Sequence, residues 1–315
     1  MTKLRASLLA LSLAALAAAA MAAAAPADAM GKIRCDRTNI AAVALGRYDP
    51  IVNHNGTGSA HEHQFFGNIA WHSLPNPNMA NYADLVGKDN NCRSVLGLAY
   101  SADSAGYWVP TLRYKAGTPH AGLLIPARQF TAYYRGYTGR AFGPGMAFPA
   151  DTRLVATDDL GTGAHGWNCG EFSRQARREG TVNHIPDCSG ERGGAGHTLT
   201  AHITFPSCWD GVRPNHPASA VGDTSDTRHY RYPEAGGVCP VGFPNQMTQL
   251  RETVQFDYVG NGTDVELSSD AHAGYHDGES MHADFWNTWR QTDFQNFVRL
   301  CATSRIPHSH ASCQP

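Results

Sequence analysis

The chain has 315 residues, of which 42% are hydrophobic and 17% are charged, and its formal net charge is −2. This is the composition of an ordinary globular protein, and the near-neutral charge argues against a nucleic acid or an acidic membrane surface as partner. Sixteen histidines make up the unusual part of the composition.

A secretory signal peptide is predicted for residues 1–29. Lys3 and Arg5 form a short basic start, and an apolar run rich in small residues follows. Small residues before the cut favour cleavage after Ala29, so that the mature chain begins near Met30. No later run of about 18 apolar residues occurs. We therefore expect a protein that is secreted, to the extracellular space or the periplasm, and has no membrane span.

All eight cysteines lie in the mature part of the chain. An even number of cysteines in an exported protein predicts disulfides rather than thiol chemistry. Closeness along the chain favours three bridges and leaves two cysteines for a fourth, so the predicted pairs are Cys169–Cys188, Cys208–Cys239, Cys301–Cys313 and Cys35–Cys92.

The 32 glycines and 18 prolines are spread almost evenly and divide the chain into short segments. Alternation of apolar and polar residues marks several of these segments as strands. The predicted strands are 95–101, 122–136 with a break at Pro126, 152–157, 197–206, 250–259 and 264–269. The sequence thus predicts one mainly antiparallel β domain over residues 30–302, a sandwich or jelly roll held by disulfides, followed by a tail over residues 303–315.

Residues 281–302 alone read as helical, because large apolar side chains recur there at intervals of three to five residues. The predicted helix begins at about Asp284 or Asn287 and ends at Cys301. On this interpretation Asp284 could serve simply as the helix N-cap.

Residues 59–68 (SAHEHQFFGN) hold the first candidate site. In an extended segment, residues two apart project from the same face, so His61 and His63 can present two imidazoles to one metal ion while Glu62 points away. Phe65 and Phe66 are expected to anchor the strand in the core, and Gly67 to let the backbone turn sharply. The alternative is a surface pair of histidines.

A third ligand must come from elsewhere in the chain. His282, with Asp284 two residues on, is the best candidate, and His276 with Asp277 is a weaker one in the same stretch; the alternative makes His282 a solvated loop residue. His229, in DTSDTRHYRYP (223–233), is a further candidate, and its alternative is a polar loop closed by the Cys208–Cys239 bridge.

Other catalytic signatures are weak. The chain contains no G-x-S-x-G motif and no nucleotide-binding glycine motif. Acids that could act on glycosidic bonds are Asp210, Glu252, Asp270, Asp277 and Glu279, most of them read as turn or surface residues; Glu252 lies in an apolar strand, where burial would raise its pKa. Aromatic side chains expected to be exposed for stacking on sugars are Trp71, Tyr107, Trp108, Tyr133 and Tyr134.

Segments over nearly the whole mature chain resemble a family of secreted fungal and bacterial proteins catalogued as a domain of unknown function. In fungi this family is sometimes joined to cell-wall-type carbohydrate-binding modules. The resemblance lies in DPIV, AHEHQFFG, YWVPTLRYK, TAYYRG, ITFPSCWDGVRPNHP, HYRYP, VCPVGFPNQMTQLRETVQFDY and HADFW.

The family's histidine motifs map by resemblance onto a small set of positions, which are His61, His63, His229, His282 and Asp284. Two departures stand out. Ala283 occupies a position where the family usually has glycine, and the insert at 218–225 leaves His216 as an alternative to His229.

Together these observations predict a polar centre in which His61, His63 and His282 are the metal ligands and His229 and Asp284 complete the site. Imidazole nitrogen suits copper or zinc. Two functions remain open: an enzyme that acts on extracellular polysaccharide or cell-wall glycan, and a non-catalytic metal-binding or wall-associated protein.

Overall fold

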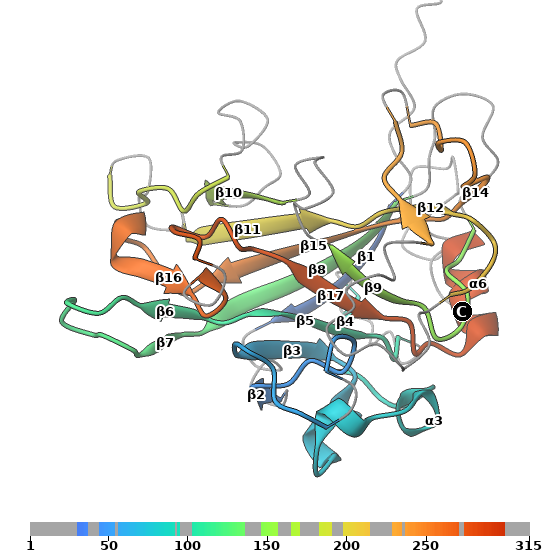
Figure 1. Cartoon of the computed structure of the whole chain (residues 1–315), viewed down its shortest axis with the longest axis horizontal. Helices are drawn as coiled ribbons and strands as arrows, with labels where there is room; N and C mark the ends of the chain where they lie inside the picture. Colours follow the sequence, from blue (N-terminus) through green and yellow to red (C-terminus); the bar gives the residue numbers. More distant parts are fainter. Residues whose placement is uncertain are drawn as a thin grey trace, which may run out of the picture.

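The computed structural model describes residues 30–36, 44–53, 56–91, 93–94, 103–135, 146–156, 165–170, 183–190, 198–214, 229–234, 237–270 and 274–299. Within these ranges the chain is mainly β and its sheets are antiparallel, as the sequence predicts (Figure 1). The predicted signal peptide, the predicted strand 95–101 and the predicted tail lie outside the described residues. The cysteine side chains of the predicted Cys35–Cys92 and Cys301–Cys313 bridges also lie outside the described part of the chain.

The largest sheet has six strands, and every neighbouring pair in it is antiparallel. Pro126 stands between the short strand β7 (Leu124–Ile125) and the long strand β8, where the predicted strand 122–136 was expected to break. In sheet order the strands are β10 (His165–Cys169), β11 (Leu199–Thr204), β15 (Gln249–Phe256), β8 (Ala127–Arg135), β1 (Met30–Asp36) and β4 (Arg93–Ser94).

A five-stranded sheet packs face to face against the first. Phe66 of the second sheet stacks on Phe130 of the first with ring centroids 4.4 Å apart, and Tyr107 contacts the same ring. The main hydrophobic core lies between the two sheets, which makes the fold a β-sandwich. In sheet order the strands are β2 (Leu45–Gly46), β3 (His63–Gly67), β5 (Gly106–Pro110), β17 (Ala283–Trp286) and β9 (Arg153–Ala156).

Two three-stranded sheets flank the sandwich. One consists of β13 (Tyr230–Arg231), β12 (Cys208–Trp209) and β14 (Asn245–Gln246), and the other of β16 (Val265–Leu267), β6 (Leu112–Tyr114) and β7. The bridges Cys169–Cys188 and Cys208–Cys239 are present, which confirms two of the four predicted pairs. The short helical elements are η1 (Ile69–Ser73), η2 (Pro77–Met79), α3 (Tyr82–Leu85), η6 (Gly262–Asp264) and α6 (Gln291–Phe297).

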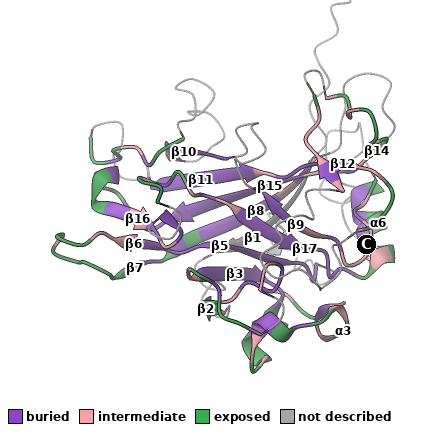
Figure 2. Ribbon diagram, viewed as in Figure 1, coloured by how far each residue is buried: buried purple, intermediate pink, exposed green. Residues whose placement is uncertain are grey.

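The five-stranded sheet is covered on both faces. Its outer face carries a second core in which Phe65, Trp108 and Trp286 pack against side chains of the segment that runs from β2 to α3, including Trp71 and Leu85. Figure 2 shows β3, β5 and β17 as buried strands. This sheet therefore lies in the interior of the molecule rather than at its surface.

The two cores overturn the expectation of exposed aromatic residues. Trp71, Tyr107, Trp108 and Tyr134 are all buried, and Tyr133 is partly buried. Trp71 and Trp108 fill the outer core, whereas the hydroxyl groups of Tyr107 and Tyr134 hydrogen-bond to each other between the sheets at 2.5 Å. These four rings stabilise the fold and offer no face to a sugar.

The predicted start of the C-terminal helix was wrong. Residues 283–286 form β17, in which Ala283 and Phe285 face the main core while Trp286 faces the second. The helix α6 begins only at Gln291, with Arg290 in the N-cap position. Asp284 is consequently a strand residue and not a helix cap.

Candidate metal centre

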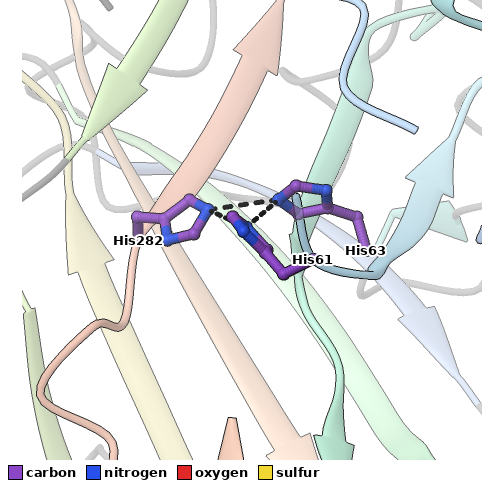
Figure 3. Close-up of side chains that lie close together, drawn as sticks. All are labelled: His61, His63 and His282. Carbon is purple, nitrogen blue, oxygen red and sulfur yellow. Dashed lines mark hydrogen bonds between the residues drawn. The ribbon is translucent and has the colours of Figure 1, made fainter. Parts of the chain in front are cut away.

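Three imidazole rings converge at one end of the five-stranded sheet (Figure 3). The Nε2 atom of His61 lies 3.0 Å from that of His63 and 3.2 Å from that of His282. The third separation, between His63 and His282, is 3.1 Å. The three residues predicted as metal ligands are thus adjacent in space.

The H-x-H segment is held in place by the residues around it. Phe65 and Phe66 are fully buried, as the sequence predicts, and the structure places one in each core. Gly67 has a φ of 86°, and a Cβ atom there would lie 2.4 Å from the carbonyl oxygen of Ala105, so that glycine is required. His61 lies just before β3, and its ring still contacts that of His63, with centroids 4.4 Å apart and the ring planes tilted by 58°.

Glu62 points away from the three rings. Its carboxylate accepts hydrogen bonds from Arg113 and Thr111. The carbonyl oxygen of Glu62 accepts two more, one from the Thr111 amide at 3.0 Å and one from the Ser268 hydroxyl at 2.6 Å. The peptide between the two histidines is therefore fixed to the neighbouring sheet of β6 and β16.

Hydrogen bonds to backbone carbonyls set the tautomers of two rings. The Nδ1 atom of His63 lies 2.8 Å from the carbonyl oxygen of Tyr48, and the Nδ1 atom of His282 lies 2.9 Å from that of Ser280. A carbonyl oxygen only accepts, so both Nδ1 atoms carry the proton. In the neutral rings the two Nε2 atoms then present lone pairs to each other at 3.1 Å.

The surroundings keep these imidazoles neutral. Burial lowers the pKa of His63 well below its usual range, and the neighbouring His282 and His61 rings lower it further, while the hydrogen bond to Tyr48 opposes the shift. Burial also lowers the pKa of His282, against the opposing hydrogen bond to Ser280. Neutral imidazole is the form that binds a metal ion.

Asp284 lies beside the centre on the same face of the sheet. Its Oδ2 atom is 4.0 Å from Nε2 of His63 and 3.9 Å from Nε2 of His282. The side chain is fully buried, and neither of its oxygens accepts a hydrogen bond from any described residue. Burial, followed by the nearby Asp49 and Glu252 carboxyls, raises the pKa of Asp284 well above its usual range.

The remaining predicted histidines lie outside the group of three. His229 pairs instead with Asp210, its Nδ1 atom 2.7 Å from a carboxylate oxygen, next to the Cys208–Cys239 bridge. His276 is exposed, and the alternative His216 lies outside the described residues. Of the predicted histidines in the described part of the chain, His61, His63 and His282 form the group whose ligand atoms all lie within 4.8 Å of one another.

The candidate acids differ in their surroundings. Glu252 is fully buried, and burial raises its pKa well above its usual range, as expected from its strand. Asp270, one of the acids of which most were read as turn or surface residues, is buried and accepts hydrogen bonds inside the connection that leads to His282. Asp277 pairs with Lys115, and Glu279 is exposed.

Sequence reasoning missed the groups that orient the rings. Tyr48 and Ser280 act through their carbonyl oxygens, and a backbone atom leaves no signature in the residue type. Asp270, in a Ser-Ser-Asp segment, resembles an ordinary turn acid. The only feature of Ser280 that the sequence shows in this respect is its position two residues before His282.

The geometry suits a metal ion with three protein ligands. With bonds of about 2.0–2.1 Å to imidazole nitrogen, separations of 3.0–3.2 Å correspond to angles of roughly 90–105° at the ion. Three ligands on one side of an ion leave other positions available to water or a substrate, as in catalytic zinc sites. The residues present could therefore hold a metal ion.

Comparison with known proteins gives one match. No curated protein and no solved structure matches the chain. A family model matches residues 49–289, a range that includes all three histidines and most of both large sheets. The chain belongs to the family described as Domain of unknown function (DUF1996).

Proposed function

We propose that the three-histidine centre binds copper or zinc and that the protein is a metal-dependent enzyme of the exported compartment. One observation carries the proposal: three Nε2 atoms converge, the lone pairs of His63 and His282 face each other at 3.1 Å, and a proton on either ring or a cation between them makes this contact favourable. Burial disfavours the proton, since it lowers the pKa of both rings. A metal ion resolves the contact, and imidazole nitrogen favours copper or zinc.

Asp284 supports a catalytic role for the centre. Its distances of 3.9 and 4.0 Å from two Nε2 atoms exceed the roughly 3.3 Å between two ligands of a tetrahedral ion. The carboxyl group is therefore not a direct ligand but lies just beyond the ligands, where it can accept a hydrogen bond from a water molecule at the centre. A bound metal ion supplies a Lewis acid and lowers the pKa of such a water.

Extracellular polysaccharide or cell-wall glycan is the proposed substrate class. Among the described residues, Tyr275 is the exposed aromatic side chain, with 44% of its surface accessible, and it lies seven residues before His282. An exposed ring on the connection that carries a ligand could stack on a sugar. The same proposal includes a signal peptide over residues 1–29 and one domain over residues 30–302. The two disulfides support export, because disulfides form and persist in oxidising compartments. The described helices include none with the length and hydropathy to span a bilayer.

A non-catalytic metal-binding protein is the second candidate. The observation that favours it is the burial of the centre: His63 is fully buried, and only 13% of the His282 side chain is exposed. Such a centre could hold an ion without admitting a polymer.

Elemental analysis of protein purified without chelator tests the metal. We expect copper or zinc in stoichiometric amount in the wild type and a loss of it in the variant His61→Ala/His63→Ala. The matched control His229→Ala/His276→Ala also removes two histidines but spares the centre, and it should keep the metal. A wild type without bound metal, before and after incubation with either ion, would contradict the proposal.

Asp284→Asn separates the two candidates. The substitution keeps the shape of the side chain and all three nitrogen ligands, so metal binding should persist. In an enzyme, the release of new sugar chain ends from cell-wall polysaccharide should fall by about 10²-fold or more, the range of a lost acid–base group. If wild type and variant alike release no sugar ends while both bind metal, the non-catalytic candidate is favoured.

A further inference from the structure

The connection from β16 to β17 is organised around one buried carboxylate. Asp270 is 2% exposed. One of its oxygens accepts the amides of Leu267 and Gly278, both at 2.9 Å, and the other accepts the amide and the hydroxyl of Ser280 at 3.2 and 2.6 Å. Four donors from three residues thus converge on a single side chain, which is how a buried charge is satisfied.

Ser280 connects Asp270 to the metal centre through hydrogen bonds. Asp270 holds Ser280 by its amide and its hydroxyl, and the carbonyl oxygen of Ser280 accepts the Nδ1 proton of His282 at 2.9 Å. The ring direction of His282 therefore depends on where the peptide of Ser280 lies. Groups that hold the second nitrogen of a ligating histidine fix both its tautomer and its orientation.

The same connection also contacts the segment that carries His61 and His63. Ser268, two residues before Asp270, donates its hydroxyl to the carbonyl oxygen of Glu62 at 2.6 Å. Glu62 stands between His61 and His63 in the sequence. A shift of this connection would consequently displace both halves of the centre with respect to each other.

We propose that Asp270 is a positioning residue that directs the His282 imidazole, and that the metal affinity of the centre depends on its carboxylate. This inference rests on the proposed metal site. Asp270→Asn tests it because an amide has only one oxygen. Whichever way the amide is turned, its NH₂ group faces at least one backbone amide, which can only donate, so at least one of these hydrogen bonds is lost.

The rival interpretation is that Asp270 only stabilises its connection. A matched control distinguishes the two: Asp187 accepts the amide and the hydroxyl of Ser189, at 2.8 and 2.5 Å, in the same arrangement but at an exposed position. Zinc affinity is measured by competition with a chromogenic chelator for wild type, Asp270→Asn and Asp187→Asn. We expect a loss of about 10–100-fold for Asp270→Asn, as for other groups that orient a metal-bound histidine, and no loss for Asp187→Asn.

A measurement on metal-free protein keeps the test independent of zinc. Long-range nitrogen–proton NMR shows which ring nitrogen of His282 is protonated, and it also reports whether the variant is folded. The wild type should show the Nδ1–H form alone, and folded Asp270→Asn a mixture of both tautomers. If Asp270→Asn is unfolded, Ser280→Ala, which removes the hydroxyl bonds to Asp270 and Ser269 but keeps the amide bond to Asp270, should still show a partial loss of zinc affinity.

Each outcome decides the point. A folded Asp270→Asn with wild-type zinc affinity and an unchanged His282 tautomer overturns the inference. Equal losses in Asp270→Asn and Asp187→Asn overturn it as well, because a general loss of loop stability then explains both. A wild type that binds no zinc removes the proposed metal site and the affinity claim with it, and the tautomer alone then decides whether Asp270 directs His282.

Discussion

Glu252 is a buried acid whose cost to the fold can be measured. It lies on β15 between Leu250 and Val254 of the main core, it is fully buried, and neither carboxyl oxygen accepts a hydrogen bond from a described residue. Burial raises its pKa well above the usual value. The folded protein therefore keeps this carboxyl protonated over a pH range in which the unfolded chain has already lost the proton.

The consequence for stability has a definite sign. Between the unfolded-state pKa and the raised folded-state pKa the native state binds more protons, so the free energy of unfolding falls as pH rises. One such group contributes a slope of about 1.4 kcal/mol per pH unit over that range. Asp49 and Asp103, whose pKa values burial raises to about 6 and about 7, add slopes of the same sign.

The variant Glu252→Gln isolates the contribution of this residue. Glutamine keeps the shape and cannot ionise, so the slope of unfolding free energy against pH should become shallower by about 1.4 kcal/mol per unit above the unfolded-state pKa. Urea unfolding followed by fluorescence at a series of pH values gives both curves. Parallel curves for wild type and Glu252→Gln would show that Glu252 is not protonated in the fold and would refute the reasoning.

Three further predictions concern the centre and the chain around it. Zinc at about 100 times its dissociation constant should stabilise the wild type by about 2.7 kcal/mol, seen as a rise in Tm, and should leave His61→Ala/His63→Ala unchanged; an equal rise in both would place the ion elsewhere. Gly67→Ala should lower the free energy of unfolding by more than about 1 kcal/mol, because the added Cβ would lie 2.4 Å from the Ala105 carbonyl oxygen at a φ of 86°. A variant whose free energy of unfolding, measured by chemical denaturation, equals that of the wild type would contradict this. Thiol titration of the denatured mature protein should give no free thiol, and two or more equivalents would mean that a predicted bridge is absent.

Local patterns in the sequence predicted one half of the centre well. His61 and His63 were paired from their spacing alone, because residues two apart in an extended segment share a face. His282 was chosen for its neighbour Asp284, and the resemblance then mapped onto the same residue; no local pattern can specify a contact between residues 221 positions apart. The position of His229 beside Asp210 was equally invisible to spacing.

The strand β17 and the burial of Tyr107 and Trp108 on β5 were missed for one physical reason. The five-stranded sheet has a core on each face, so Phe285 and Trp286 are both buried although they point in opposite directions. A strand covered on both sides loses the apolar–polar alternation that identifies strands in a sequence. The aromatic spacing that remained favoured a helix, and large rings such as Trp108 looked available for ligands.

The three histidines also join distant parts of the chain. The two observed disulfides close loops of 19 and 31 residues, whereas His61 and His282 are 221 residues apart. In the chain-entropy account of cross-links, a closed loop of this length restricts the unfolded chain by about 5 kcal/mol, against about 3 kcal/mol for the shortest of the three. An ion held by these rings would act as a longer cross-link than either described disulfide, tying β3 to β17 across the intervening strand β5. Unlike a disulfide, that cross-link would be removed by a chelator rather than by a reductant.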